Sequence, residues 1–266
     1  MIRRSAPKAA QSSGPPEGEL DPTKLRLVLA GERLFAQGGI DNVSLREISA
    51  AAGQGNNAAV QYHFGSKEGL IVALTRFRVA QMEEPRRRML ERAETLGRLK
   101  DIFTLVEILC LPQLDLVDET GQHPYAQFMS QYISRYRPRG LPHGSDFATP
   151  GSVHVRRLAQ LICKRIDFVP PHVACSRLEL CNLMFNNALV RFDNEQLLQR
   201  DQVSFEVIVH DTIELAAAAL CVPMRGDCAK TYSVSSWLET TAATLKADSE
   251  EIQDDPPDAG RDQASI

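Results

Sequence analysis

Asn57 and Gln61 carry side chains whose chemistry suits the recognition of nucleic-acid bases. Each amide presents a hydrogen-bond donor and an acceptor in one plane, and this pair of groups can bind adenine bidentately in the major groove. Arg46 supplies a cation a short distance before them in the chain. Such side chains can meet DNA only if helices present them outward, so the surrounding elements decide whether this chemistry is available.

A helix that begins at Ser44 positions Arg46. Ser44 and Glu47 have the spacing of a capping box, in which the Ser hydroxyl accepts from the Glu47 N–H and the Glu47 side chain accepts from the N–H of Ser44. The core face of this helix carries Leu45, Ile48 and Ala52, which leaves Arg46 on the outer side of the first turn. Gly53 is expected to end the helix and begin a turn.

A second short helix follows the turn and presents the amides. Asn56 or Asn57 can cap its start, and we expect it to run to about His63. Val60 and Phe64 then form the inward face, while Asn57, Ala58 and Gln61 point outward. Ser66 caps a third helix that begins at Lys67. An earlier helix, capped by Asp21 with Pro22 in its first turn, carries an apolar stripe at helical spacing and ends at Gly38 and Gly39.

The segment from Leu25 to Leu70 resembles the N-terminal DNA-binding domain of TetR-family transcriptional regulators. About 50 residues match in order. The matching features are Ala30-Gly31, Leu34-Phe35, Gly39, Leu45 with Ile48, Ala52-Gly53, and the block Tyr62-His63-Phe64-x-Ser66-Lys67-Glu68-x-Leu70. The resemblance implies an all-α fold, with a three-helix helix-turn-helix domain followed by a larger helical domain for ligand binding and dimerisation.

The resemblance also implies roles for single residues. Arg46 matches a position of base or phosphate contact. Asn57, Ala58 and Ala59 match base-reading positions, and Gln61, His63 and Lys67 match positions of backbone contact. The DNA-binding candidates are Arg46, Gln54, Asn56, Asn57, Ala58, Ala59, Gln61, Tyr62, His63 and Lys67.

Two features depart from the family pattern. The turn from Gly53 to Asn57 is one residue longer than the usual form, which leaves the register of positions 54–57 open by one residue. Gln61 stands where many members have tyrosine, so it could read a base instead of binding a phosphate. Tyr62 and Phe64 favour a core interpretation, and His63 is equally consistent with a phosphate contact and with filling the joint between two helices.

The charge distribution fits DNA binding at one end of the chain only. The 266 residues carry a net charge of -4, which excludes a uniformly basic surface. Residues 1–90 contain 13 Lys and Arg against 9 Asp and Glu, a balance of +4, whereas residues 222–266 contain 4 against 9, a balance of -5. The run Arg86-Arg87-Arg88 lies beyond the DNA-binding segment and is predicted to be a solvated face.

Motifs of other protein classes are absent from the sequence. It lacks GxSxG, HExxH, a phosphate-binding Gly loop and an EF-hand pattern, so no enzyme activity is predicted. The histidines are not at metal-ligand spacing, and no metal or cofactor is expected. The six cysteines form no CxxC pair and are expected to be reduced and mostly buried. With no run of about 18 apolar residues and no signal peptide, the protein is expected in the cytoplasm, without a membrane partner.

The middle of the chain contains the candidates for an effector pocket. An apolar stretch from Leu99 to Leu116 is predicted to be a helix broken near Pro112, and the next helix, from Gln122 to Tyr136, carries an aromatic and Met stripe. Such a stripe is usually core, but it is also where a ligand cavity would be lined. The pocket candidates are Leu105, Leu109, Tyr125, Phe128, Tyr132 and Met184, and their character suggests a small, largely apolar effector.

The last two helices, predicted at 172–199 and 204–221, carry wide apolar faces and an alanine run at 216–219. We expect them to pair with their copies in a second subunit as a four-helix bundle, the family's usual dimer interface. Packing within the monomer alone is the alternative. The interface candidates are Cys181, Phe185, Leu189, Phe192, Ile208, Leu215, Ala216 and Ala219.

The predicted organisation has four parts: a disordered arm at 1–20, the helix-turn-helix domain at 21–68, the ligand-binding and dimerisation domain at 69–221, and an acidic, largely disordered tail at 222–266. The predicted function is a homodimeric, ligand-responsive regulator, most simply a repressor, that binds double-stranded operator DNA. The alternative is a protein-binding regulator with a degenerate helix-turn-helix and no specific operator. The helix that begins at Lys67-Glu68 is expected to transmit the effector signal.

Overall fold

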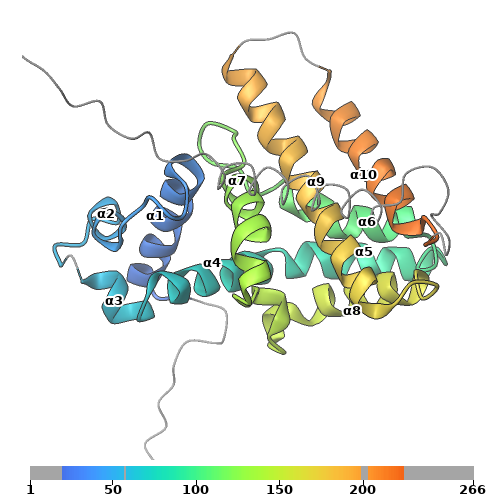
Figure 1. Ribbon diagram of the computed structural model, residues 1–266, viewed down its shortest axis with the longest axis horizontal. Coiled ribbons are helices and arrows are strands. Elements are labelled where there is room, and N and C mark those ends of the chain that lie inside the picture. The colour runs from blue at the N-terminus through green and yellow to red at the C-terminus, as the bar shows by residue number, and fades with distance from the viewer. Residues whose placement is uncertain (1–19, 57, 199–202, 225–266) are drawn as a thin grey trace, which may run out of the picture. The chain divides into compact units, whose positions relative to one another are not determined.

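The computed structural model describes residues 20–56, 58–198 and 203–224, and all regular elements in these ranges are helical (Figure 1). The chain divides after Val222 into two compact units, and the second lies almost wholly outside the described residues. The predictions for the arm at 1–20, apart from Leu20, and for the tail at 222–266, apart from its first three residues, also fall outside them. The all-α prediction is confirmed.

Three of the four N-terminal helices, those capped by Asp21, Ser44 and Ser66, begin at the residues that the sequence indicates. Asp21 accepts from the N–H groups of Thr23 and Lys24, both at 3.0 Å, which fixes the start of the first helix. Ser66 accepts from the N–H of Gly69 at 3.0 Å and caps the fourth. The four helices are α1 (Pro22–Gly38), α2 (Leu45–Ala51), α3 (Ala59–Phe64) and α4 (Lys67–Gln81).

The remaining helices form the larger part of the first unit. They are α5 (Glu83–Thr95), α6 (Ile102–Cys110), α7 (Pro124–Gln131), α8 (Val153–Arg165), α9 (Pro171–Leu197) and α10 (Phe205–Cys221). A π-helical turn, Tyr132–Tyr136, continues α7. In Figure 1, α7 crosses between the N-terminal helices and the group formed by α8, α9 and α10.

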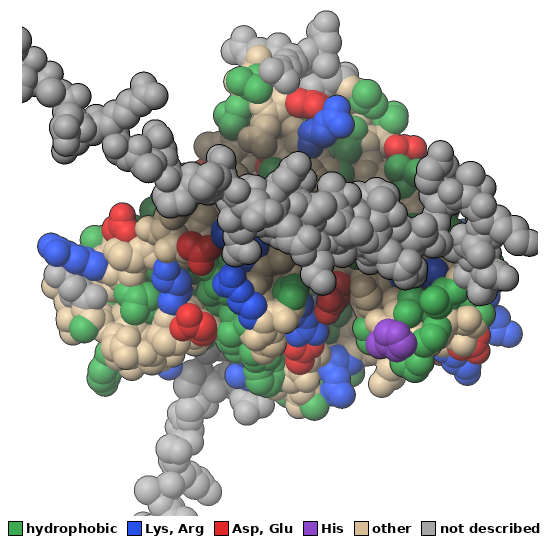
Figure 2. Space-filling view, in the orientation of Figure 1, with side chains coloured by type: hydrophobic (Ala, Val, Ile, Leu, Met, Phe, Trp, Pro, Cys, Tyr) green, Lys and Arg blue, Asp and Glu red, His purple; other side chains and the backbone are tan. Residues whose placement is uncertain are grey.

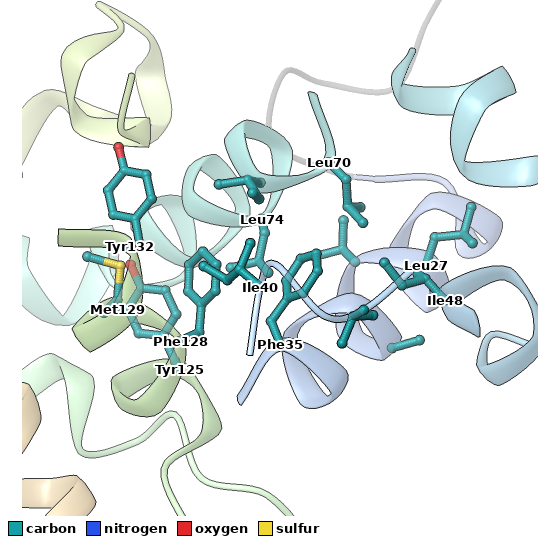
Figure 3. Close-up of a cluster of buried hydrophobic side chains, with 14 of the residues drawn as sticks. Leu27, Phe35, Ile40, Ile48, Leu70, Leu74, Tyr125, Phe128, Met129 and Tyr132 are labelled. Carbon is teal, nitrogen blue, oxygen red and sulfur yellow. The ribbon is translucent and has the colours of Figure 1, made fainter. Parts of the chain in front are cut away.

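One hydrophobic core joins the N-terminal helices to α7 (Figure 3). The Phe35 ring of α1 stacks on Phe128 of α7 with ring centroids 6.1 Å apart, and Phe128 in turn stacks on Tyr132 at 6.0 Å. Leu27, Ile48, Leu70 and Leu74 belong to the same cluster. Because α7 shares this close-packed core, a shift of α7 would displace the helices that carry the DNA-binding candidates.

A second core holds α5, α6, α8, α9 and α10 together. It contains Leu105, Leu158, Phe185, Leu189 and Ala216. This cluster shares no residue with the first, although α7 contributes Ala126 to it on its other side. Helix α7 therefore lies between the two cores.

The prediction of a solvated face at 86–88 is wrong for Arg86. Arg87 and Arg88 pair with Glu84 on the helix surface, but Arg86 is only 2% exposed. Its guanidinium lies 3.5 Å from Glu83, and burial lowers its pKa. The reason is the helical period: the turn of α5 that follows Met82 directs position 86 inward while its neighbours stay outside.

Candidate nucleic-acid interface and the adjoining cavity

The capping box at Ser44 fixes the direction of Arg46. The Glu47 N–H donates to Ser44 Oγ at 3.2 Å, and the Ser44 N–H donates to Glu47 Oε2 at 2.7 Å. The bond from the Ser44 backbone lowers the pKa of Glu47. Ile48 is fully buried on the opposite side of α2, so the Arg46 side chain is exposed, as predicted.

The turn before α3 is longer than the capping pattern predicts. Asn56 Oδ1 accepts from the N–H of Ala58 at 2.9 Å, but α3 begins only at Ala59. The amide of Asn56 therefore closes the turn ahead of the helix. Asn57 lies outside the described residues, and its contact with a base edge stays a prediction.

The other DNA-binding candidates differ in accessibility. Arg46, Asn56, Ala58, Gln61 and Tyr62 are exposed, whereas Gln54, His63 and Lys67 are partly buried. Ala59 is only 5% exposed and belongs to the first core, which leaves it no side-chain surface for DNA.

The prediction that the Tyr62 ring is buried in the core is wrong. It is 82% exposed and meets the His63 ring edge-on, with centroids 5.0 Å apart. Phe64, by contrast, is partly buried and packs against the first core, as predicted. Tyr62 thus belongs to the accessible face of α3, beside Gln61.

Helix α4 closely approaches the end of α3 because residue 69 is glycine. A Cβ at Gly69 would lie 2.0 Å from the carbonyl oxygen of Phe64, well inside contact distance. The glycine therefore allows the sharp connection that holds the short helix α3 against α4.

Lys67 is engaged with the protein backbone. Its Nζ donates to the carbonyl oxygens of Ile40 at 2.9 Å and Asp41 at 3.3 Å, in the loop between α1 and α2. A phosphate contact by Lys67 stays a prediction. Its replacement would also loosen this loop, so it is a poor probe of DNA contact alone.

Basic side chains do not form a continuous patch on the face of the described residues seen in Figure 2. Lys and Arg side chains lie among Asp and Glu over the N-terminal helices. DNA contact on this face would therefore depend on a few placed side chains more than on a broad positive field.

The end of α7 is fastened to the loop between α1 and α2. Gln131 makes two bonds to that region: the Ile40 N–H donates to its Oε1, and its Nε2 donates to the Phe35 carbonyl, both at 3.0 Å. In the π-helical turn, the Tyr136 hydroxyl donates to Asp41, and Arg135 pairs with Asp41 at 3.0 Å. The bond from Tyr136 lowers the pKa of Asp41.

The same helical segment also lines a cavity. Met129, Tyr132 and Ile133 line a space of about 290 Å³, to which α8 and α9 contribute Cys163 and Leu178 among others. Nine of the sixteen lining residues are apolar or aromatic, and seven are polar or charged. This combination is typical of a small-molecule site.

The structure brings together some of the pocket candidates and separates others. Leu109 and Tyr132 line the cavity. Tyr125 and Phe128 are buried in the first core, and Leu105 in the second, while Met184 packs against the second core. Along the sequence stripe on α7, Tyr125 and Phe128 lie in the core alone, whereas Met129 and Tyr132 belong to the first core and also line the cavity. This difference depends on where neighbouring helices lie.

Sequence reasoning missed the loop at 143–146, which contributes His143, Ser145 and Asp146 to the cavity. This loop also contacts α4. The Gly144 N–H donates to Thr75 Oγ1 at 3.0 Å, and a Cβ at Gly144 would lie 2.6 Å from the Arg76 backbone. The sequence signal available was a histidine and a glycine in a Pro-rich loop, which is too weak to indicate a site.

Five of the eight candidates for the dimer interface pack against other residues of the same chain. Cys181, Phe185, Leu189 and Ala216 are buried in the second core, and the Phe192 ring lies tilted against the Phe205 ring, with centroids 4.8 Å apart. Leu215 and Ala219 are exposed on α10, and Ile208 is partly exposed. The solvent-facing apolar surface of α10 is thus smaller than predicted.

The described residues contain no helix that is both long and apolar enough to cross a bilayer. Cys110, Cys163, Cys175, Cys181 and Cys221 are free thiols. Only Cys110 and Cys181 of these five are buried, so the expectation that most thiols are buried is wrong for the described cysteines.

Comparison with known proteins shows that the N-terminal part is similar to one family. Residues 27–74 match the family model described as bacterial regulatory proteins, tetR family. A search of curated protein sequences found no match. One similar structure is a proposed TetR-family transcriptional regulator from Mesorhizobium loti MAFF303099, with 17% identity, a TM-score of 0.41, and coverage of 76% of this chain and 97% of that one. Another, described as the molecular basis for control of antibiotic production by bacterial hormones, has 18% identity, a TM-score of 0.43, and coverage of 76% and 98%.

Proposed function

We propose that this chain, a TetR-family regulator by its DNA-binding domain at residues 27–74, represses transcription and is released from its operator by a small, largely apolar effector. The observation that carries the DNA-binding part is the accessible face formed by Arg46, Gln61 and Tyr62 on two helices held by one core. Arg46 and Gln61 supply charge and amide chemistry for phosphates and base edges.

Operator reading requires two copies of this face. Two recognition helices on one DNA side need two-fold symmetry and a separation of roughly 34–36 Å, one helical turn of the duplex. The homodimer would form through α9 and α10, with the exposed side of α10 as the surface that pairs. Ile208, Leu215 and Val222 lie seven residues apart and therefore nearly on one line along that helix.

Effector release is supported by the double role of the α7 segment. Met129, Tyr132 and Ile133 of this segment line the cavity, while Gln131 and Tyr136 bond to the loop between α1 and α2. A ligand that prefers a displaced α7 would shift this loop and the spacing of the recognition helices. The shift in population follows from the differential affinity of the ligand for the two forms.

This route differs from the one expected from sequence, in which α4 transmits the signal. Lys67 joins the start of α4 to the same loop, and the Gly144 N–H bond to Thr75 connects α4 to the loop at 143–146 that lines the cavity. The α7 segment makes direct bonds to Phe35, Ile40 and Asp41, so we assign the main coupling to it.

The test is a gel shift at low salt on the DNA upstream of the protein's own gene. Wild-type protein is expected to bind, and Arg46→Ala to weaken binding about tenfold, the loss expected for one specific charged contact. Arg88→Ala is the matched control, because Arg88 is an arginine with a 72% exposed side chain on α5, outside the DNA-binding domain. Gln61→Ala should alter the preferred sequence. Absence of binding by the wild-type protein at low salt would contradict the proposal.

A further inference from the structure

His143 lines the cavity beside α7 and has a buried ring nitrogen, Nε2, without a hydrogen-bond partner. Among the described residues, three buried side-chain nitrogen or oxygen atoms have no hydrogen-bond partner: Arg86 Nε, His143 Nε2 and Asn186 Oδ1. Of these three residues only His143 lines the cavity. A buried donor without a hydrogen-bond partner is destabilising, so a partner supplied by a bound molecule would be favoured.

The other ring nitrogen of His143 fixes which proton is present. Its Nδ1 accepts from the Ser145 N–H at 3.3 Å and lies 2.8 Å from the Ser145 hydroxyl. Burial is the main cause that lowers the pKa of His143 to about 4, which leaves the imidazole neutral at pH 7. A neutral ring carries one proton, and with Nδ1 accepting, that proton is on Nε2. His143 therefore offers a hydrogen-bond donor.

The charged residues around the cavity offset one another. Arg137 donates to Asp146 and, through Nε at 3.0 Å, to Glu179, so both lining carboxylates are paired with it. Arg156, the remaining lining cation, is exposed. The apolar residues of the lining include Leu109, Met129, Ile133 and Leu178. Such a site disfavours an ionised ligand, because burial of an unpaired charge is costly.

We propose that the cavity binds a neutral, mainly apolar molecule whose single essential polar group is a hydrogen-bond acceptor, such as a carbonyl oxygen, that accepts from His143 Nε2. This inference rests on the proposed effector function for its biological meaning, but the binding itself does not depend on DNA. The Gly144 N–H bond to Thr75 would place the occupied site next to α4 as well as α7.

Two variants separate the two nitrogens of His143. Asparagine places an amide oxygen near the position of Nδ1, so His143→Asn keeps an acceptor for the Ser145 N–H and removes the donor at Nε2. Glutamine places an amide nitrogen near the position of Nε2, so His143→Gln keeps a donor. The asparagine and glutamine variants have similar polarity, and circular dichroism checks that both variants fold.

The probes are two bicyclic ketones, 1-tetralone and 2-decalone, each compared with the hydrocarbon of the same skeleton, tetralin and decalin. Calorimetric titration of full-length protein without DNA is expected to show ketone binding that weakens about tenfold in His143→Asn and is retained in His143→Gln. The hydrocarbon affinity should be equal in all three proteins. In wild-type protein, the ¹⁵N signal of His143 Nε2 should move when the ketone saturates the site.

Three results would overturn the inference: no ketone binding, equal ketone affinity in His143→Asn and wild type, or an unmoved Nε2 signal at saturation. Gel shift with and without ketone then tests the effector role separately. Ketone binding that depends on His143 but leaves DNA binding unchanged supports this site and counts against the proposed release mechanism. If a ketone releases the protein from DNA but binds His143→Asn as tightly as wild type, the result supports the proposed release mechanism and counts against the role of His143 in binding.

Discussion

At the scale of single residues, the neighbours of a side chain in the folded protein decide whether it is exposed, bonded or buried, more than its chemical type does. Lys67 is a cation within a DNA-binding motif, yet its ammonium is bound to two backbone carbonyls of the α1–α2 loop. Tyr62 is aromatic, yet it stands in solvent beside Gln61. Arg86 is one of three consecutive arginines, yet it is the one that is buried. Each assignment follows from which neighbours are within reach in the folded chain.

His143 predicts a pH dependence of stability. Its pKa is about 4 in the folded chain against 6.5 for an unperturbed histidine, so between these values the unfolded chain binds more protons. Its contribution to stability is complete above pH 6.5 and is lost as the pH falls towards 4. The free energy of unfolding should decrease by up to about 1.4 kcal/mol per pH unit in this window through this residue.

Urea unfolding at several pH values between about 7 and 4.5 measures this slope. His143→Asn should be less sensitive to acid than wild type, because asparagine does not titrate, while Asp146, Arg137 and Arg86, whose charges also act on the His143 pKa, are unchanged. His172→Asn is the control, since His172 is exposed. Equal slopes for wild type and His143→Asn would show that His143 is not buried in its neutral form.

At the scale of elements, α7 and its π-helical turn connect the cavity to the DNA-binding helices. π-helical turns are rare and frequently lie at functional sites. Here the turn holds Tyr132 and Ile133 on the cavity and Arg135 and Tyr136 near Asp41. Burial and the bond to Asp41 raise the pKa of Tyr136 to about 12, so its hydroxyl keeps its proton and stays a donor at neutral pH.

Gln131→Leu is expected to loosen the loop between α1 and α2. The variant removes the bonds to Ile40 and Phe35 and leaves the Ile40 N–H without its partner, at a cost of about 1–3 kcal/mol. Amide hydrogen exchange at Ile40 should accelerate by roughly tenfold or more. Ser130→Ala is the control on the same helix, because the Ser130 hydroxyl bonds only to Ala126 of α7. Unchanged protection at Ile40 in Gln131→Leu would exclude Gln131 as a link.

At the scale of the whole molecule, the first unit has two hydrophobic cores, one on each side of α7. The first core ties α1 to α4 and α7 into one body, and the second holds α5, α6, α8, α9 and α10. The predicted boundary at residue 68 does not coincide with a break between the cores, because α7 completes the core of the N-terminal helices. Movement between the two cores, at α7, is the change that a ligand in the cavity could favour.

Leu215→Glu should disrupt the proposed homodimer. Leu215 is 54% exposed on the outer side of α10, between Ile208 and Val222 on the same line. Two-fold symmetry would bury a glutamate from each subunit, and association should weaken by at least about 100-fold, roughly 3 kcal/mol. Sedimentation velocity over a concentration series measures this. Leu96→Glu, at a leucine 60% exposed after α5, is the control and should sediment as wild type. A monomeric wild-type protein at all concentrations would contradict the dimer.

The sequence by itself determined the local structure and the family of the N-terminal part. Caps at Asp21, Ser44 and Ser66, the apolar period and the block at 62–70 depend on residues within a few positions of one another, so they can be read along the chain. The accessible positions of Arg46 and Gln61 follow from the same local rules.

Only the tertiary structure decided which segments distant in sequence pack against each other. Whether Phe128 belongs to core or cavity, whether Cys181 and Phe185 face a partner or α10, and which nitrogen of His143 is left without a bond all depend on helices that lie far apart in sequence. The physical reason is that an apolar side chain packs equally well against any apolar surface, so its pattern shows that it is buried but not against what. The link from Gln131 to Ile40, across 91 residues, could be found only where the folded chain brings them together.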